Sequence, residues 1–144
     1  MRIWKHDFSI DGLNAMSTNT MVEYLDILFT EAGDDFLVAS MPVNHKTVQP
    51  MRILHGGASV VLAETVGSVA SNLCVEDFSS THVVGLDINA NHIRSVSEGG
   101  MVYAKVTPLH IGRSTHVWSI HITNEKHKLV CVSRLTMSVI QAKS

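Results

Sequence analysis

Charge, cysteine and long apolar runs are all scarce in this sequence, and each shortage excludes a class of protein. Charged residues make up 17% of the chain and its formal net charge is -2, so we expect no surface that binds nucleic acid or an anionic membrane. The two cysteines, Cys74 and Cys131, do not provide a disulfide framework or a zinc-knuckle spacing. The apolar stretch 54–65 is interrupted by Glu64 and is too short to span a bilayer.

These shortages indicate a small cytoplasmic protein. The opening residues 1–7 hold no apolar segment of signal-peptide length, and we interpret both cysteines as reduced core thiols. With 144 residues, of which 45% are hydrophobic, the chain is expected to form a single domain over residues 1–144. The low charge also favours an oligomer, in which apolar surface is hidden between subunits.

The order of the apolar patterns indicates an α+β domain. Ser9 can cap a short helix, because Ile10, Leu13 and Met16 follow it at helical spacing. Two short apolar runs on either side of a Gly-Asp turn predict a hairpin: residues 25–29 and 36–41. Four longer segments rich in Val, Ile and Thr predict a meander of four more strands: residues 83–93, 101–111, 114–122 and 129–140.

Between the hairpin and the meander lies a segment that predicts a long buried helix. Residues 59–72 are apolar or small on nearly every side, so this helix belongs inside the domain, wrapped by the sheet. Glu64 is the only charged residue between His55 and Glu76. Because burying an unpaired carboxylate costs on the order of several kcal/mol, Glu64 is the first candidate for a catalytic residue.

Each of these candidate residues also has a structural interpretation. Glu64 could be a structural carboxylate paired with Arg94 or Arg134. Ser68, one turn after Glu64 on the same face, could hold a water or the reacting group, or it could bond back to a helix carbonyl. The His-Gly-Gly sequence at 55–57 could offer free amides to a carbonyl oxygen, or it could be an ordinary N-terminal turn.

The motifs do not support other catalytic chemistries. The nine histidines show no H-x-H or H-E-x-x-H spacing and have no cysteine pair nearby, so we predict no metal site and no cofactor. The sequence contains no G-x-S-x-G elbow and no G-x-G-x-x-G phosphate loop. Neither Ser95 nor Ser114 has the partners of a catalytic triad.

Two stretches of the chain resemble a known family. The run 49–70, which contains LHGGASVVLAE, resembles the signature of hotdog-fold thioesterases of the 4-hydroxybenzoyl-CoA type, which use a glutamate. The run 83–95, VVGLDINANHIRS, is similar to the bacterial 1,4-dihydroxy-2-naphthoyl-CoA thioesterases of menaquinone biosynthesis. The similarity extends over nearly the whole chain. It implies a hotdog fold, in which a six-stranded antiparallel sheet wraps around one long central helix.

The resemblance also implies a role for individual residues. Glu64 would be the nucleophile or general base, and Ser68 would orient the water or the acyl group. The amide of Gly56 would bind the thioester oxygen with help from Gln49, and His55 would shape the site. The remaining residues implied by the family are CoA contacts: Gly85; His92, Ile93, Arg94 and Ser95; and His110, Ile111, Gly112, Arg113, Ser114 and Thr115.

Two positions depart from the family pattern. Arg52 stands where a small residue is usual, which bears on acyl specificity. Residues 113–115 order their polar side chains differently, which bears on the contacts with the CoA phosphates.

The predicted activity is hydrolysis of acyl-CoA thioesters, aromatic ones above all, with 1,4-dihydroxy-2-naphthoyl-CoA as the leading candidate. The family implies a homotetramer, a dimer of hotdog dimers with each active site at a dimer interface. Two alternatives stay open at this point. A hotdog enoyl-thioester hydratase or dehydratase would need a histidine as acid–base partner of the helix carboxylate. A non-catalytic acyl-CoA binding protein would have no use for Glu64.

Overall fold

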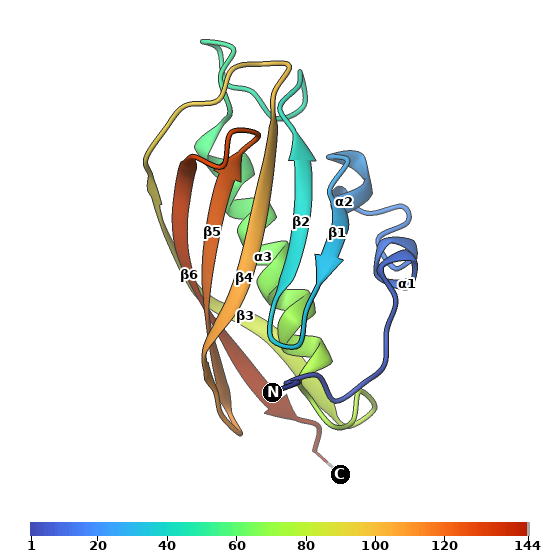
Figure 1. The fold of residues 1–144 in the computed structure, drawn as a ribbon. Coiled ribbons are helices and arrows are strands. Elements are labelled where there is room, and N and C mark those ends of the chain that lie inside the picture. The colour runs from blue at the N-terminus through green and yellow to red at the C-terminus, as the bar shows by residue number, and fades with distance from the viewer. Residues whose placement is uncertain (144) are drawn as a thin grey trace.

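The computed structural model describes residues 1–143 and shows one antiparallel sheet curved round a long helix (Figure 1). The sheet has six strands in the order β1-β2-β4-β5-β6-β3. The strands are β1 (Leu28–Ala32), β2 (Leu37–Pro42), β3 (Thr81–His92), β4 (Met101–Ile111), β5 (Thr115–Asn124) and β6 (Leu129–Gln141). The helices are α1 (Ile10–Ala15), α2 (Met21–Tyr24) and α3 (Gly56–Leu73). The predicted α+β class and the six-stranded antiparallel sheet around a central helix are confirmed.

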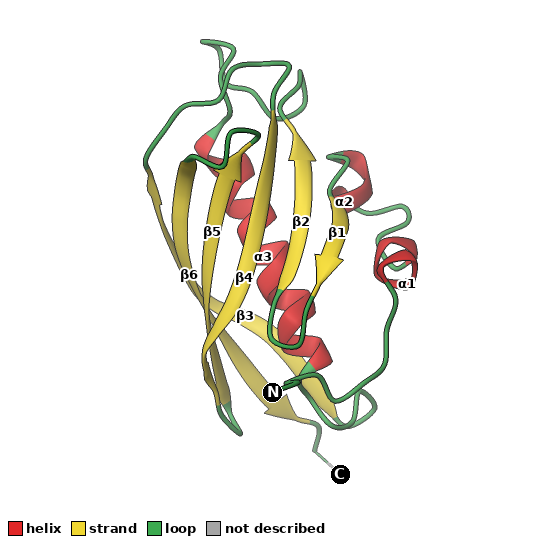
Figure 2. Cartoon of the chain, in the orientation of Figure 1, coloured by secondary structure: helices red, strands yellow, loops and turns green. Residues whose placement is uncertain are grey.

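The N-terminal part of the chain forms the predicted helix and hairpin. Ser9 caps α1, and its hydroxyl oxygen accepts a hydrogen bond from the amide of Gly12 at 3.0 Å. The hairpin of β1 and β2 is closed by the amide of Gly33, which donates to the carbonyl of Phe36 at 2.9 Å. The single turn of α2 was not predicted. Figure 2 shows α1 and α2 beside β1, while α3 lies across the inner side of the sheet. No helix within residues 1–143 is both long and apolar enough to cross a membrane.

The predicted meander of four strands is wrong in one respect. Strands β4, β5 and β6 follow one another across the sheet, but β3 pairs with β6 and not with β4. The reason lies in the connections. Short turns join β4 to β5 and β5 to β6, whereas residues 93–100 form a longer connection that crosses the end of the sheet (Figure 1). Strand β3 is therefore an edge strand.

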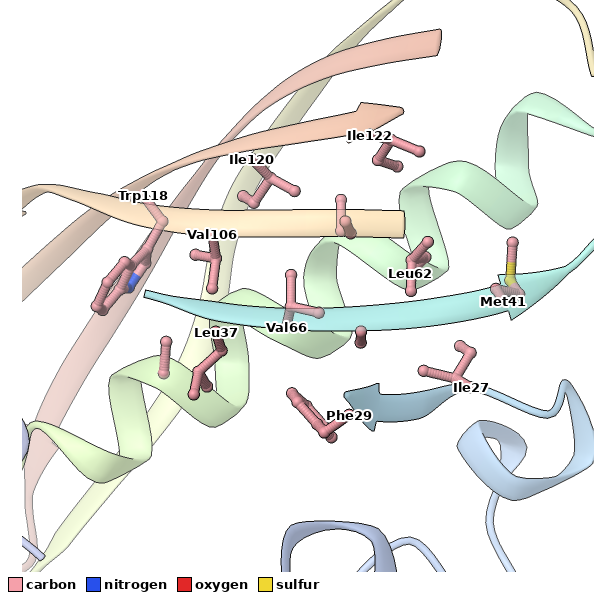
Figure 3. Packing of buried hydrophobic residues seen from close by; sticks show 14 of the residues in the cluster. Ile27, Phe29, Leu37, Met41, Leu62, Val66, Val106, Trp118, Ile120 and Ile122 are labelled. Atoms are coloured by element: carbon pink, nitrogen blue, oxygen red, sulfur yellow. The ribbon is translucent and has the colours of Figure 1, made fainter. Parts of the chain in front are cut away.

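The core lies between the inner face of the sheet and one face of α3. Leu62 and Val66 of the helix pack with Val106 and Ile120 of the sheet, and all four side chains are fully buried (Figure 3). Deeper along the helix, the indole nitrogen of Trp118 donates to the hydroxyl of Ser71 at 2.6 Å. This bond satisfies two buried polar groups and fixes the C-terminal half of α3 against β5.

The sheet covers one face of helix α3 and leaves the opposite face partly exposed, so the expectation that this helix is buried nearly all round is wrong. Its buried residues fall on one face: Ser59, Leu62, Ala63, Val66, Gly67, Ala70, Ser71 and Leu73. The opposite face is partly exposed and carries Val61, Glu64, Thr65, Ser68, Val69 and Asn72. The sequence suggested a helix buried all round because this second face also contains valines. The second face is open to a ligand or to another chain.

Candidate active site

Glu64 lies in the middle of α3 on the open face, and the expectation that it is buried is wrong. Its carboxylate points at Gly85 of β3, because a Cβ atom placed on Gly85 would overlap Glu64 Oε1 and lie 3.6 Å from Cδ. Within residues 1–143 the carboxylate forms no ion pair, and Arg94 donates instead to the carbonyl of Leu129 at 2.6 Å. The alternative of a structural pair with Arg94 or Arg134 is therefore wrong. An unpaired, accessible carboxylate is free to act on a substrate.

A β-bulge in β3 makes room for this carboxylate. Gly85 pairs with Met137 and Asp87 pairs with Thr136, so Leu86 is an extra residue in β3. Bulges of this kind bend a strand and redirect its side chains, and they are frequent beside active sites. Gly85, predicted as a CoA contact, therefore lies directly against Glu64, and the absence of its side chain lets the carboxylate approach the strand.

We predict that Gly85→Ala lowers turnover by about 100-fold, since a displacement of about 1 Å in a reacting group can cost that much. The added methyl group would overlap the end of the flexible Glu64 side chain and would push the carboxylate aside. Because that side chain can turn away, the free energy of unfolding should change by less than about 0.5 kcal/mol. Steady-state kinetics and thermal unfolding of the same preparation measure both effects. Wild-type turnover in a folded Gly85→Ala protein would show that the position of the carboxylate is unimportant.

Ser68 lies one turn beyond Glu64, and its hydroxyl is available. Within residues 1–143 this hydroxyl makes one hydrogen bond, a long one to the sulfur of Met137 at 3.9 Å. The interpretation in which Ser68 bonds back to a helix carbonyl is therefore wrong, although Thr65 does bond to the carbonyl of Val61 at 2.7 Å. Ser68 can donate to, or accept from, a group held beside the Glu64 carboxylate.

The start of α3 presents one free backbone amide. His55 is the N-cap residue, and its Nδ1 accepts a hydrogen bond from the amide of Gly57 at 2.8 Å. No residue from 1 to 143 accepts a hydrogen bond from the amide of Gly56. His92 lies against this glycine, since a Cβ atom on Gly56 would be 2.8 Å from His92 Nε2. The helix dipole and this free N–H suit a carbonyl oxygen or an oxyanion.

Gln49 is held in the tight loop that precedes the helix. Its backbone amide donates to the carbonyl of Ile53 at 2.9 Å, and its side-chain oxygen accepts from the amide of Met51. Arg52 in the same loop has a positive φ of 60° and forms an ion pair with Glu98. The guanidinium holds the pKa of Glu98 below its usual range. Arg52 thus anchors the loop, which gives it a structural role separate from acyl specificity.

One chain does not bring all the predicted site residues together. Gly56 and Glu64 are eight residues apart on one helix, which separates them by about 12 Å along its axis. Thr115 follows the turn from β4 to β5 and pairs with Ser138 of β6, which pairs on its other side with Val84 of β3. Thr115 and Val84 therefore lie at the same height along the sheet. His92 is eight residues further along β3, or about 26 Å away. The segments 92–95 and 110–115 therefore lie at opposite ends of the sheet.

A cavity of about 500 Å³ lies beside the C-terminal half of α3. Val69 and Asn72 of the open helix face line one side of it. Leu73 at the end of α3 also lines it, and the rest of the lining comes from the N-terminal segment and from the loop after α3: His6, Asp7, Phe8, Ser9, Gly12, Leu13, Met16 and Phe78. Asn72 also donates to the carbonyl of Ser68 at 2.8 Å, so the cavity continues the helix stripe that carries Ser68 and Glu64. The sequence did not reveal it, because Phe8, Leu13 and Met16 have the spacing of ordinary packing residues.

The two cysteines are poor nucleophiles. Both Cys74 and Cys131 are free and buried. Burial raises the pKa of the Cys74 thiol to about 12, and it raises the pKa of Cys131 as well. Since the thiolate is the reactive form, neither cysteine is a candidate nucleophile.

Comparison with known proteins gives a consistent result. The family model described as "Thioesterase superfamily" matches residues 51–131. The 1,4-dihydroxy-2-naphthoyl-CoA hydrolase of Escherichia coli is 52% identical over 138 residues, which cover 96% of this chain and 99% of that protein. The structure of thioesterase HI1161 from Haemophilus influenzae has a TM-score of 0.93 and 49% identity, over 99% of this chain and 97% of that one. A mutant of thioesterase PA1618 from Pseudomonas aeruginosa also has a TM-score of 0.93, with 45% identity over 96% of this chain and 99% of that one.

Proposed function

This chain belongs to the thioesterase superfamily, has the hotdog fold and hydrolyses acyl-CoA thioesters, and from that premise we propose that Glu64 is its catalytic carboxylate. The observation that carries the proposal is the position of Glu64. It is unpaired within residues 1–143, accessible on the open face of α3, and followed one turn later by the hydroxyl of Ser68, which is held only by a weak hydrogen bond to the sulfur of Met137.

The chemistry needs an activated oxygen and a donor for the carbonyl oxygen. The Glu64 carboxylate either attacks the thioester carbon itself or removes a proton from the water that attacks it. In the proposed mechanism the amide of Gly56, assisted by the side-chain NH2 of Gln49, stabilises the negative charge that develops on the carbonyl oxygen. The carbon–sulfur bond then breaks, the CoA thiolate takes up a proton, and the acid is released after water has supplied its oxygen. Ser68 holds the water or the acyl group beside Glu64.

We further propose that each site is shared between two chains. A reacting carbonyl must lie about 3 Å from both the attacking group and the oxyanion donor, but Gly56 and Glu64 of one chain are separated by about 12 Å. A second chain can supply the missing half. The edge strand β3 supports such a dimer because it is 12 residues long and exposes Val84 and Leu86.

Pairing two β3 strands antiparallel about a twofold axis has a second consequence. The end of β3 in one chain, with residues 92–95, would lie beside the beginning of β3 in its partner. The first residues of β3 lie at the same height along the sheet as the turn that carries residues 110–115. The two segments proposed to bind CoA, which one chain keeps apart, would then meet across the dimer interface. We propose a homotetramer built from two such dimers, working in the cytoplasm.

The proposed substrate is 1,4-dihydroxy-2-naphthoyl-CoA, in menaquinone biosynthesis. Two observations support an aromatic acyl group: the activity named for the E. coli relative, and the largely apolar cavity that begins at Val69 and Asn72 and extends to Phe8 and Phe78. An acyl group whose carbonyl lies at Glu64 can extend along the helix stripe into that cavity.

We predict that Ser68→Ala lowers turnover by about 10- to 1000-fold and barely changes the apparent affinity for CoA. The reason is that Ser68 positions the reacting groups without contacting the nucleotide. Thr65→Ala is a matched control, since Thr65 lies on the same helix face but its hydroxyl is already bonded to Val61. Steady-state hydrolysis and competition by free CoA provide the measurements. Equal rates for Ser68→Ala and wild type would reduce Ser68 to a packing residue.

A further inference from the structure

Two aromatic rings form one end of the cavity beside α3. His6 and Phe78 are stacked, with ring centroids 4.0 Å apart and an angle of 24° between their planes. Both rings line the cavity, together with Phe8, Val69 and Asn72. The rings come from segments far apart in sequence, so the stack exists only where the N-terminal segment crosses the loop after α3.

The His6 side of this stack is held firmly in place. His6 Nε2 lies 2.7 Å from the carbonyl oxygen of Val75, to which its N–H donates. The neighbouring Lys5 is fixed twice, since its amide donates to the carbonyl of Leu73 at 2.8 Å and its ammonium group pairs with Glu76 at 3.0 Å. The imidazole is therefore already ordered before a ligand binds, so binding against it loses little side-chain entropy.

The Phe78 side is incompletely packed. Phe78 is 51% exposed, although it is a large apolar side chain beside a cavity. Flat rings gain most from offset or edge contacts with other rings, and linear chains do not make such contacts. A planar acyl group in the cavity would bury more of Phe78 and extend the stack.

We propose that the His6–Phe78 stack is a specificity-determining wall of the acyl pocket, which favours flat aromatic acyl groups over linear ones. The inference rests on the proposed function, because it places the carbonyl of the substrate at Glu64 and the acyl group in the cavity beside Val69 and Asn72, further along the same helix face. The stack does not contact the reacting atoms. It determines which acyl groups bind well, and it therefore affects the ratio of the kcat/KM values of different acyl groups.

The test compares benzoyl-CoA with hexanoyl-CoA, two substrates of similar size but different shape. In Phe78→Ala, the ratio of kcat/KM for benzoyl-CoA to that for hexanoyl-CoA should fall by about five- to tenfold. Phe78→Tyr, which keeps the ring, should retain the wild-type ratio, and His6→Ala should lower it in the same direction as Phe78→Ala. Tyr24→Ala is the matched control, because Tyr24 is also a large exposed aromatic residue (67% exposed) but does not line the cavity.

An unchanged ratio in Phe78→Ala would overturn the proposal, and so would an equal fall in Tyr24→Ala. The ratio cancels any general loss of catalysis, so it does not depend on which residue performs the chemistry. Failure of the proposed function would instead appear as full turnover in Glu64→Gln on both substrates. The two failures are therefore distinguishable. Because Phe78 is half exposed, its substitution should leave folding intact, and Phe78→Tyr provides a second variant if Phe78→Ala is unstable.

Discussion

Glu64→Ala protein and Gln49→Ala protein should regain activity when they are unfolded together and refolded as a mixture. Each variant alone has a defect in every site, because every site contains one Glu64 and one Gln49. If the two residues reach a site from different chains, a hybrid dimer has one site with both defects and one site with neither. With random pairing about half of the dimers are hybrids, so about a quarter of all sites are wild type.

The activity of the refolded mixture should therefore rise well above that of either parent, provided that Gln49→Ala is itself impaired. Mixing Glu64→Ala with Ser68→Ala is the matched control. Glu64 and Ser68 lie on the same helix face of one chain, so every site in that mixture keeps one of the two defects. Activity that stays at the average of the parents in the Gln49 experiment would mean that the site lies within one chain, and the two-chain proposal would fail.

Much of the fold follows from local patterns in the sequence. Strand β4 begins at Met101 and ends at Ile111 as predicted, because the segment is rich in β-branched residues and ends at a glycine turn. The start of α3 was predicted three residues too late, at 59 in place of 56. Two glycines have low helix propensity, and the cap that His55 provides for the amide of Gly57 depends on a side-chain geometry that spacing does not reveal.

The position of β3 could not be predicted in the same way. Alternation shows that residues form a strand, but it does not say which neighbour the strand pairs with. The connection 93–100 is long enough to cross the sheet, so β3 reaches β6 and becomes an edge strand. That position also explains why a strand with apolar residues such as Val84 and Leu86 is so exposed in one chain.

The candidate site also combines features that the sequence predicts with features that only the structure shows. A lone charge in an apolar helix identifies Glu64, but the apolar pattern predicts a core position, whereas Glu64 lies on the open face of α3. The approach of the carboxylate to Gly85 depends on a bulge in a strand some twenty residues later, and the His6–Phe78 stack depends on contacts across most of the domain. Such long-range contacts have no local signature, so they become visible only in three dimensions.

Glu64→Gln should abolish thioester hydrolysis while leaving the fold intact. The amide has the size of the carboxylate but can neither attack a thioester carbon nor accept a proton from water. Since Glu64 is partly exposed and forms no ion pair within residues 1–143, its loss should change the free energy of unfolding by less than about 0.5 kcal/mol. The effect on turnover should therefore be chemical and not structural.

The most direct test of the role of Glu64 is the rate at which Glu64→Gln protein releases CoA from aromatic and aliphatic acyl-CoA thioesters. The proposed mechanism predicts a fall in kcat of about 1000-fold or more on every substrate, with an unfolding midpoint close to that of wild type. Turnover within about tenfold of wild type on every thioester tried would contradict it, because general acid–base catalysis alone contributes more than that.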